Sequence, residues 1–508
     1  MVRDLLPEIN LDGRQDDLGE EPNPRAKKFY EMCAKVQQPI WPGNPTTLLE
    51  WATKIAGKKT ANRDSASSAD GTVEVALMSA HPDYIYTLPQ DWRSVKKFML
   101  NLGLSFRTYD FCINHCFLYY KDGLHLDKCP TCGESRYEAR RGKGKRVPQR
   151  KMWFFPLTER LQRLYMSRKT AEHMTWHVKC KRRSDPVIHP AGSEQWAHFD
   201  EIFPDFASEI CNVRLGLCTD GFDPHHGTTT SPHSIWPVFI TPYNLPPDLC
   251  MRPEFIFMTA LIQGPEDPSI HIDVMLRPIV DELKDLWHHG AVTYDSFRKQ
   301  NFTMRASLFC TINDFPGYAM LSGWSTKGKL GCPCCMQNTD AFYLKNTRKV
   351  CWFDEHRKFL PPNHPERRNQ NDYIRGRVVR DMYPERMDIR DVVRQVASLP
   401  EVTFGKCTTI ANKYKPPEGK GKYHNWSKRS IFWELIYWPV LFVRHNLDVM
   451  HTEKNCFEQV HVTTFDLGKN SKDNLQSRQD LRDWTNRSEL FIDENDNTSH
   501  QYFIYNIN

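Results

Sequence analysis

The sequence predicts a mixed α/β core that carries a long, metal-anchored insertion and follows a small metal-binding domain. Three observations support this. Apolar strand-like segments between residues 213 and 314 include two that end in aspartate. Upstream of them, cysteines are paired at the spacing of metal ligands. A further Cys-x2-Cys pair follows the second aspartate, and two histidines far downstream are available to complete its ligand set.

The composition narrows the functional class. The 508 residues carry 68 Lys and Arg against 62 Asp and Glu, a formal net charge of +6, which is compatible with nucleic-acid binding without requiring it. No apolar run is long enough to span a membrane, and the first residues contain no apolar signal core. The 16 cysteines, several of them in pairs, favour metal binding in a reducing compartment over disulfides.

The N-terminal region is polar and punctuated by Gly, Pro, Asp and Ser. Residues 1–80 are expected to be partly disordered, with a linker over 57–71 and a short helix over 47–55. An amphipathic pattern then predicts a helix over 88–105.

Four cysteines follow in two pairs, Cys112-x3-Cys116 and Cys129-x2-Cys132. Two pairs bridged by a short span match a tetrahedral thiolate zinc site. A neighbouring histidine, His115 or His125, is available to replace one thiolate.

A basic run comes next. Residues 140–146 hold five positive charges, which is typical of a solvated loop, a nuclear-import signal or a phosphate-contacting patch. The candidate DNA-binding residues here are Arg140, Arg141, Lys143, Lys145 and Arg146. Helices are expected over 157–166 and 169–177, with a basic face that either contacts DNA or is solvated.

From residue 213 the pattern changes to strands. The expected elements are strands over 213–220, 234–242 and 254–265, a helix over 273–288, and a strand over 305–314. The order β-β-β-α-β, with acids ending the first and fourth strands, is the order of the ribonuclease H-like fold.

Asp220 and Asp314 are therefore the first two candidate catalytic residues. In a two-metal mechanism, carboxylates hold two divalent ions that activate the attacking oxygen and stabilise the leaving oxygen. Mg²⁺, or Mn²⁺ in its place, prefers carboxylate and water ligands. Each aspartate also stands in a turn-like context, so a turn role is the alternative.

The third acid has several candidates. Asp473, which opens a helical segment over 473–484, is preferred over Glu453, which is close enough to a candidate zinc ligand to be a supporting carboxylate instead. Asp448 is the remaining candidate.

A second zinc site is predicted from Cys332, Cys335, His445 and His451, with Cys334 as an alternative ligand. Its role would be structural, holding a basic, loop-rich insertion. Considered without the cysteines, the two histidines would be interpreted as ordinary core or helix-surface residues. Nearby, Lys327 and Lys329 are candidate phosphate contacts, and Trp324 either stacks on a base or belongs to the core.

The sequence resembles the transposases of plant CACTA (En/Spm-type) DNA transposons over about residues 80–485. The segments that carry the resemblance include LPQDWRSVKKFMLNLGL (88–104), KCPTCG (128–133), FPLTERLQRLYMSRKTAEHMTWH (155–177), HFDEIFPDFASEICNVRLGLCTDGFDP (198–224), NDFPGYAMLSGWSTKGKLGCPCC (313–335), SIFWELIYWPVLFVRHNLDVMHTEKN (430–455) and GKNSKDNLQSRQDL (468–481).

The resemblance implies a DDE/D recombinase of the cut-and-paste type, located in the nucleus, that binds terminal inverted repeats and inserts the element into target DNA. It places Asp220 and Asp314 as the first two acids. The insertion looks like that of the V(D)J recombinase catalytic subunit, which favours Asp473 as the last acid. The expected partners are further copies of the same chain in a homo-oligomer and an accessory repeat-binding protein. Binding to a membrane is not expected.

The tail beyond the 468–481 segment departs from the family pattern, so a catalytically inactive or host-adopted DNA-binding remnant is the alternative function. The expected organisation is an N-terminal region (1–80), a helical and four-cysteine domain (81–150), a helical linker (151–210), the first part of the core (211–330), the insertion (331–455), and a final helix with a truncated tail (456–508).

Overall fold

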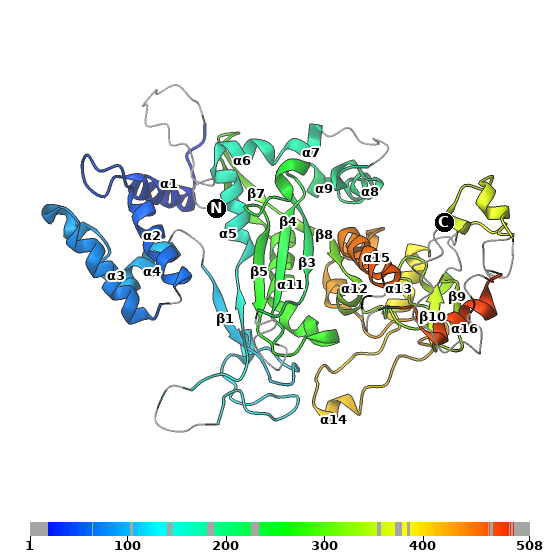
Figure 1. Ribbon diagram of the computed structural model, residues 1–508. Helices are drawn as coiled ribbons and strands as arrows, with labels where there is room; N and C mark the ends of the chain where they lie inside the picture. Colours follow the sequence, from blue (N-terminus) through cyan, green and yellow to red (C-terminus); the bar gives the residue numbers. More distant parts are fainter. Residues whose placement is uncertain are drawn as a thin grey trace.

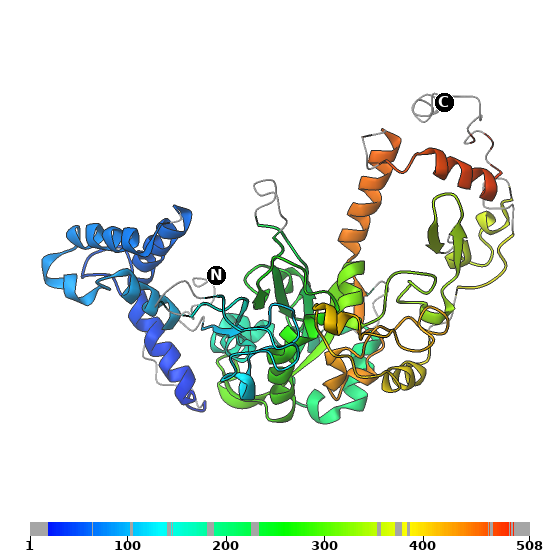
Figure 2. The ribbon, with the colours of Figure 1, turned by 90° about the horizontal axis from the view of Figure 1, so that it is seen from below.

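The computed structural model describes residues 19–491, except 63, 102–104, 140–143, 145, 180–186, 225–232, 353–356, 371–377, 384–386, 466, 468–470, 487, 489 and 490. A seven-stranded sheet forms the centre of the molecule (Figure 1). The N-terminal helices lie on one side of this sheet and the insertion lies on the other (Figures 1 and 2).

The sheet has the order β1-β2-β5-β4-β3-β8-β11. The strands β3, β8 and β11 run parallel, and the other neighbours are antiparallel. Their bounds are β1 Arg107–Asp110, β2 Lys151–Phe154, β3 Val213–Thr219, β4 Trp236–Pro242, β5 Phe257–Ile262, β8 Ala306–Asn313 and β11 His445–Leu447.

The central strands are buried on both faces, which explains their nearly continuous apolar sequences. Helix α11 (Ile272–His288) packs against β8 and buries Met275, Ile279 and Leu283 at helical spacing. The strands and the helix expected between 213 and 314 are therefore confirmed. A two-stranded hairpin, β6 (Ala291–Asp295) and β7 (Gln300–Met304), precedes β8 and was not predicted.

The four-cysteine segment is part of the sheet edge and not a domain that precedes the core. It lies between β1 and β2, which pair with each other, and β2 pairs in turn with β5. We call residues 111–135 the cysteine loop. Its position, carried by the edge of the central sheet, could not be read from the spacing of the cysteines.

The N-terminal helices form a smaller unit with its own core. Helices α2 (Leu48–Ala61), α3 (Ala66–Met78) and α4 (Trp92–Asn101) pack around Trp51, Ile55, Val73 and Val95. Helix α1 (Pro24–Gln37) instead reaches the core, where the Tyr30 hydroxyl donates a hydrogen bond to the Met166 carbonyl (2.8 Å). The expectation of a linker over 57–71 is wrong in the described residues, because α2 and α3 occupy most of that range.

The remaining helices connect or cover the strands. Helix α5 spans Leu157–Met166, as predicted, and packs against β6. Shorter helices are α6 Arg168–His173, α7 Trp176–Lys179, α8 Glu194–Ile202, α9 Pro204–Ala207 and α10 Pro247–Cys250. No helix among the described residues is long and apolar enough to cross a membrane.

The insertion begins after α12 (Phe315–Ser322) and ends at β11. It contains the hairpin β9 (Ala341–Leu344) and β10 (Lys349–Trp352) and the helices α13 (Ile389–Ala397) and α14 (Thr408–Ala411). We call residues 399–444, which lead back to β11, the return segment. Helices α15 (Val449–Thr464) and α16 (Leu475–Trp484) follow β11.

A buried ion pair fixes the return segment to the core. Lys428 is fully buried, and its ammonium donates hydrogen bonds to Asp273 (2.6 Å) and to the Ile270 carbonyl (2.7 Å). Asp273 also accepts from the Ile431 amide (3.1 Å). Burial raises the pKa of Asp273 and lowers that of Lys428, so each charge depends on the other.

We expect Lys428→Met to destabilise the fold by about 3 kcal/mol or more, because it leaves Asp273 buried without its counter-ion. Urea unfolding measures this free energy. The matched control is Arg390→Met, whose ion pair with Asp388 is largely exposed and should contribute less than about 0.5 kcal/mol. Equal, small losses in both variants would contradict the assignment.

Candidate catalytic rim and metal centre

Three carboxylates stand where three neighbouring strands end. Asp220 follows β3, Asp314 follows β8 and Asp448 follows β11. Cys218 pairs with Ile312 and Leu447 pairs with Asn313, so the three aspartates occupy corresponding positions. Because parallel strands end at the same edge of a sheet, we call these residues the acidic rim.

Two of the rim acids cap helices. The Asp314 carboxylate accepts a hydrogen bond from the Gly317 amide (2.7 Å) at the start of α12. The Asp448 carboxylate accepts from the His451 amide (3.1 Å) at the start of α15. N-capping by aspartate is common and explains why both helices begin where the strands end. Each cap uses one carboxylate oxygen.

The rim is electrostatically crowded. The pKa of Asp220 is raised, chiefly by burial and also by the negative charges of Asp314 and Asp448. A hydrogen bond from the Gly221 amide (2.7 Å) and the proximity of His451 oppose this shift. His451 Nε2 lies 4.0 Å from an Asp314 oxygen. Several acidic groups close enough to perturb one another are an arrangement that a cation would relieve.

The structure does not bring the other two candidate acids to this rim. Glu453 is exposed on α15, two residues beyond His451, which puts it on roughly the opposite side of the helix. Asp473 lies at the far end of α15, since the adjacent Lys472 amide donates to Thr463 Oγ1 (3.3 Å). That end is about 20 Å along the helix from His451. Asp473 also pairs through both oxygens with Arg478 (2.6 and 2.7 Å).

The ligands predicted for the second zinc site do not meet in the described residues. His445 Nδ1 shares a hydrogen bond with Thr311 Oγ1 (2.8 Å), and its ring packs against Tyr318 and Trp438. His451 Nε2 lies 4.0 Å from an Asp314 oxygen, and in the described residues neither histidine belongs to a close group of three or more candidate ligands. Burial lowers the pKa of His445 to about 3, so its ring is neutral, the form that a metal requires.

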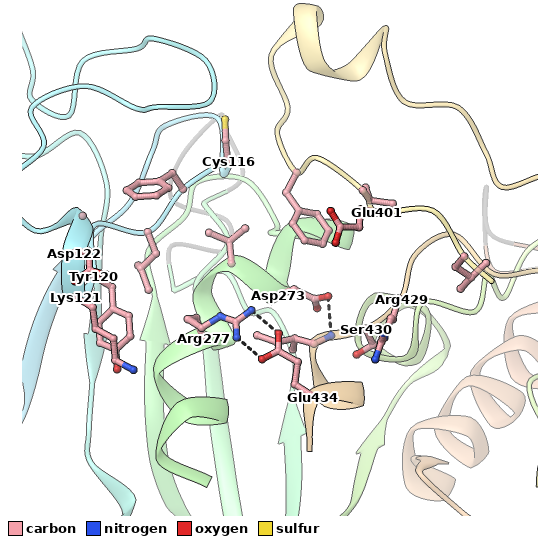
Figure 3. Close-up of a pocket in the computed structure, with 18 of the residues that line it drawn as sticks. Cys116, Tyr120, Lys121, Asp122, Asp273, Arg277, Glu401, Arg429, Ser430 and Glu434 are labelled. Atoms are coloured by element: carbon pink, nitrogen blue, oxygen red, sulfur yellow. Dashed lines mark hydrogen bonds and ion pairs between the residues drawn. The ribbon is translucent and has the colours of Figure 1, made fainter. Parts of the chain in front are cut away.

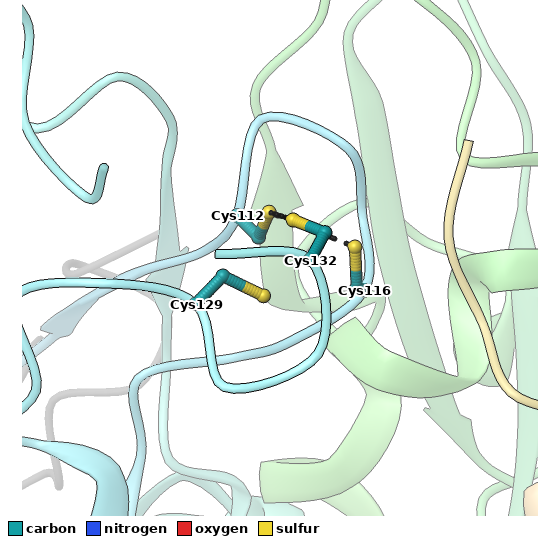
Figure 4. Close-up of side chains that lie close together, drawn as sticks. All are labelled: Cys112, Cys116, Cys129 and Cys132. Carbon is teal, nitrogen blue, oxygen red and sulfur yellow. Dashed lines mark hydrogen bonds between the residues drawn. The ribbon is translucent and has the colours of Figure 1, made fainter. Parts of the chain in front are cut away.

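The first four cysteines do meet. The Sγ atoms of Cys112, Cys116, Cys129 and Cys132 all lie within 4.8 Å of one another (Figure 4). Cys112 Sγ is 3.7 Å from Cys116 Sγ and 3.5 Å from Cys132 Sγ. A tetrahedral zinc site with bonds of about 2.3 Å requires sulfur separations of about 3.8 Å. The cluster therefore fits zinc, and it is the one group of three or more candidate ligands this close in the described part of the chain.

Local hydrogen bonds prepare the cluster for a cation. The Asn114 amide donates to Cys112 Sγ (3.4 Å). A hydrogen bond from the Cys116 thiol is the largest of the effects that lower the pKa of Cys112 to about 5. The pKa of the Cys129 thiol is instead raised by burial to about 11. A shared cation would favour the thiolate form of all four. Neither His115, which is buried, nor His125 belongs to the group of clustered ligands.

The basic candidates are placed only in part. Residues 140–143 and 145 lie outside the described residues, so Arg140, Arg141, Lys143 and Lys145 stay predictions. Arg146 is exposed and pairs with Asp127 (2.7 Å). Lys327 and Lys329 are exposed in the loop that follows α12. Trp324 is buried and donates a hydrogen bond to the Leu330 carbonyl (3.0 Å), so its base-stacking role is wrong and its core role is confirmed.

Asp448, the last of the three candidates for the third acid, is the one whose position corresponds to that of Asp314. Its signal was the same strand-then-aspartate pattern seen at Asp220 and Asp314. The preceding strand, β11, has only three residues, too few to show an alternation. The sequence pattern at Asp448 is therefore weaker than those at Asp220 and Asp314.

We expect the purified chain to hold zinc through the cysteine loop. Cys129→Ser should remove about one equivalent of zinc, measured by elemental analysis, because the site needs all four ligands. Cys456→Ser, which changes an exposed cysteine on α15, is the matched control and should keep its zinc. Zinc content that is unchanged in Cys129→Ser would exclude this site. If Cys332→Ser also contains less zinc than the wild type, the second predicted zinc site exists as well.

Comparison with known proteins gives one result that bears on these residues. Residues 185–399 match a protein-family model described as Transposase_21, "Transposase family tnp2". No curated protein matches the chain. The matched range contains Asp220, Asp314 and much of the insertion. The match supports a transposase family for this chain, and with it DNA binding and a nuclease-type enzyme.

Proposed function

We propose that the chain is a cut-and-paste transposase of the CACTA type, which cleaves and transfers DNA strands with divalent metal ions on a ribonuclease H-like core. The observation that carries the proposal is the acidic rim. Three aspartates follow three adjacent parallel strands, and two of them lie within the range that matches a transposase family. The chain order β3-β4-β5-α11, then β8, with the sheet order β5-β4-β3-β8-β11, supports the ribonuclease H-like assignment.

The residues that would hold the metal ions are Asp220, Asp314 and Asp448. Their carboxylate oxygens are the ligands that Mg²⁺ and Mn²⁺ prefer. When bound, the ions supply an activated oxygen nucleophile and stabilise the leaving oxygen of the phosphodiester. The fit rests on the matching positions of the three carboxylates at the ends of paired strands, and burial together with the charges of Asp314 and Asp448 raises the pKa of Asp220.

We assign the third acid to Asp448 in place of Asp473 or Glu453. Asp448 is held beside Asp314 by two contacts: its amide donates to the Asn313 carbonyl (2.8 Å), and its carboxylate caps α15. Asp473 lies near the far end of α15, where its carboxylate is already paired with Arg478. His451 next to Asp314 would orient that carboxylate or contact the reacting phosphate.

The DNA backbone is expected to pass over the loop that carries Lys327 and Lys329. Both lysines are exposed, and Thr326 of this loop donates a hydrogen bond to the carbonyl of Phe315, the residue after Asp314 (3.2 Å). Phosphate contacts of this kind position a duplex without reading its sequence. The same proposal includes four further expectations: that the chain recognises CACTA repeats, that it is located in the nucleus, that it self-associates, and that it acts with an accessory repeat-binding protein. The catalytically silent alternative is not favoured, because all three rim acids are present and placed together.

We expect the intact chain to cleave a duplex that ends in the element's CACTA repeats when Mg²⁺ or Mn²⁺ is added. Asp220→Ala, Asp314→Ala and Asp448→Ala should each lower the single-turnover cleavage rate by about 100-fold or more, because each removes a metal ligand. Asp473→Ala and Glu453→Ala are the matched controls and should stay within about threefold of the wild type.

The outcome distinguishes the alternatives. Loss of cleavage in Asp473→Ala with activity retained in Asp448→Ala would return the third-acid role to Asp473. Binding of the repeats without cleavage in every protein would leave a DNA-binding remnant.

We also expect Asp220→Asn to stabilise the metal-free protein at pH 7. The folded pKa of Asp220 is raised, so its contribution to stability is present below the unfolded pKa and is lost as the pH rises through the folded pKa. Asparagine removes this loss, so the melting temperature of the variant at pH 7 should be higher than that of the wild type. Mg²⁺ should raise the melting temperature of the wild type more than that of the variant. A variant less stable than the wild type at pH 7, and equal to it at pH 3, would contradict the crowding of the rim.

A further inference from the structure

The return segment crosses the cysteine loop at one narrow contact. The Gly405 backbone lies so close that a Cβ added there would stand 2.9 Å from Cys116 Sγ and 2.6 Å from Ile410 Cδ1. The next amide, that of Lys406, donates a hydrogen bond to the Asn114 carbonyl (2.7 Å). Asn114 sits between two of the cysteines. A segment from the insertion therefore touches a cluster of metal ligands nearly 300 residues away in the sequence.

Apolar contact extends this junction. Ile410 is buried, and it belongs to one hydrophobic cluster with Cys112, Cys116 and Cys129. Cys407 and Phe117 pack around the same cluster. The sulfur atoms that would hold zinc thus form part of the surface on which the return segment rests.

Polar contacts anchor the same residues to the entrance of α11. The Lys406 ammonium donates hydrogen bonds to Glu266 (2.8 Å) and to the Asp267 carbonyl (2.5 Å). The Gly405 amide donates to His271 Nδ1 (3.2 Å). Residues 405–410 are therefore held between the cysteine loop on one side and the start of α11 on the other.

The contact between the return segment and the cysteine loop borders a cleft. A cavity of about 740 Å³ lies between the cysteine loop, α11 and the return segment (Figure 3). Phe404 and Glu401 of the return segment line it, as do Cys116 and Lys121 of the cysteine loop. Arg277 on α11 also lines the cleft and donates two hydrogen bonds to Glu434 (2.6 and 2.7 Å), which lines it too (Figure 3). Between these two attachments, Lys428 also fixes the return segment to Asp273 on α11.

The cysteine loop has little regular structure that would hold its shape without a metal. Its only helical element is a three-residue turn, Lys121–Gly123. Four sulfur atoms within 4.8 Å of one another need a shared cation once they ionise, since thiolates repel. The shape of the surface beneath Gly405 and Ile410 would therefore depend on metal binding.

We infer that zinc binding to the four cysteines and docking of residues 404–410 are coupled, so that the cysteine loop is a metal-dependent clasp for the insertion. Coupling between two binding events is reciprocal: zinc favours the docked segment, and the docked segment slows the loss of zinc. Residues 411–444 lead from the clasp to β11 and Asp448, so the clasp helps to position the strand that carries one rim acid.

Two measurements on the full chain test the clasp, neither of which needs DNA or catalysis. In the first, hydrogen exchange is followed by mass spectrometry before and after zinc is removed by a chelator. Peptides covering residues 404–411 should lose protection at least about tenfold. Peptides covering α13 should not change, and β2 reports whether the sheet edge stays folded.

The second measurement follows zinc release to a colorimetric chelator. Ile410→Ala should release zinc about tenfold faster than the wild type, because it opens the apolar cover over the cysteines. Ile436→Ala removes an exposed isoleucine from the same return segment and is the matched control. Lys406→Met is a second variant, which keeps the backbone contacts of Lys406 and removes its side-chain anchors to Glu266 and to the Asp267 carbonyl.

The coupling is overturned if residues 404–411 stay protected in zinc-free protein whose β2 is still folded. It is also overturned if Ile410→Ala and Lys406→Met release zinc at the rate of Ile436→Ala. Because both readouts are independent of strand cleavage, a catalytically inactive chain would leave this inference intact, and failure of the clasp would leave the proposed chemistry intact.

Discussion

The arrangement of this molecule depends on the parallel pairing of β8 with β11. The two strands are consecutive in the sheet, yet more than one hundred residues of insertion separate them in the chain. The pairing forms only if the return segment delivers residues 445–447 beside residues 311–313. The Lys428–Asp273 ion pair and the Arg277–Glu434 pair hold that segment to α11, which itself packs against β8. The acidic rim is the result, since Asp448 reaches Asp314 through this pairing.

The central sheet and the insertion also connect the two metal centres that the chain is proposed to use. The cysteine loop belongs to one edge of the sheet through β1 and β2, and the acidic rim lies at the carboxyl ends of the parallel strands towards the other edge. The insertion touches both. Its start follows α12, which Asp314 caps, and its return segment rests on the cysteine loop before it reaches β11. One sheet therefore supports a structural metal site, a long insertion and the candidate catalytic residues.

Sequence reasoning found the elements whose patterns are long and regular. The buried strands that end at Thr219 and Asn313, and helix α11, follow directly from apolar periodicity. It did not find β11, because three residues carry no period, and it misjudged 57–71, where small and polar residues form helices capped by Thr47 and Ser65. For the site, the two strand-ending aspartates and the four cysteines were predictable from spacing. The distance of Asp473 from the rim was not, because it depends on α15 running away from the sheet.

The shortness of β11 has a consequence for how the chain works over time. Three paired residues contribute few ladder hydrogen bonds, and α15, which follows, has no buried residue among those described. Short, weakly packed elements open locally at a much smaller free energy than the whole domain needs to unfold. The part of the rim that carries Asp448 is therefore expected to open more readily than the rest of the sheet. A ligand that binds across β8 and β11 would favour the closed arrangement, in which Asp448 lies beside Asp314.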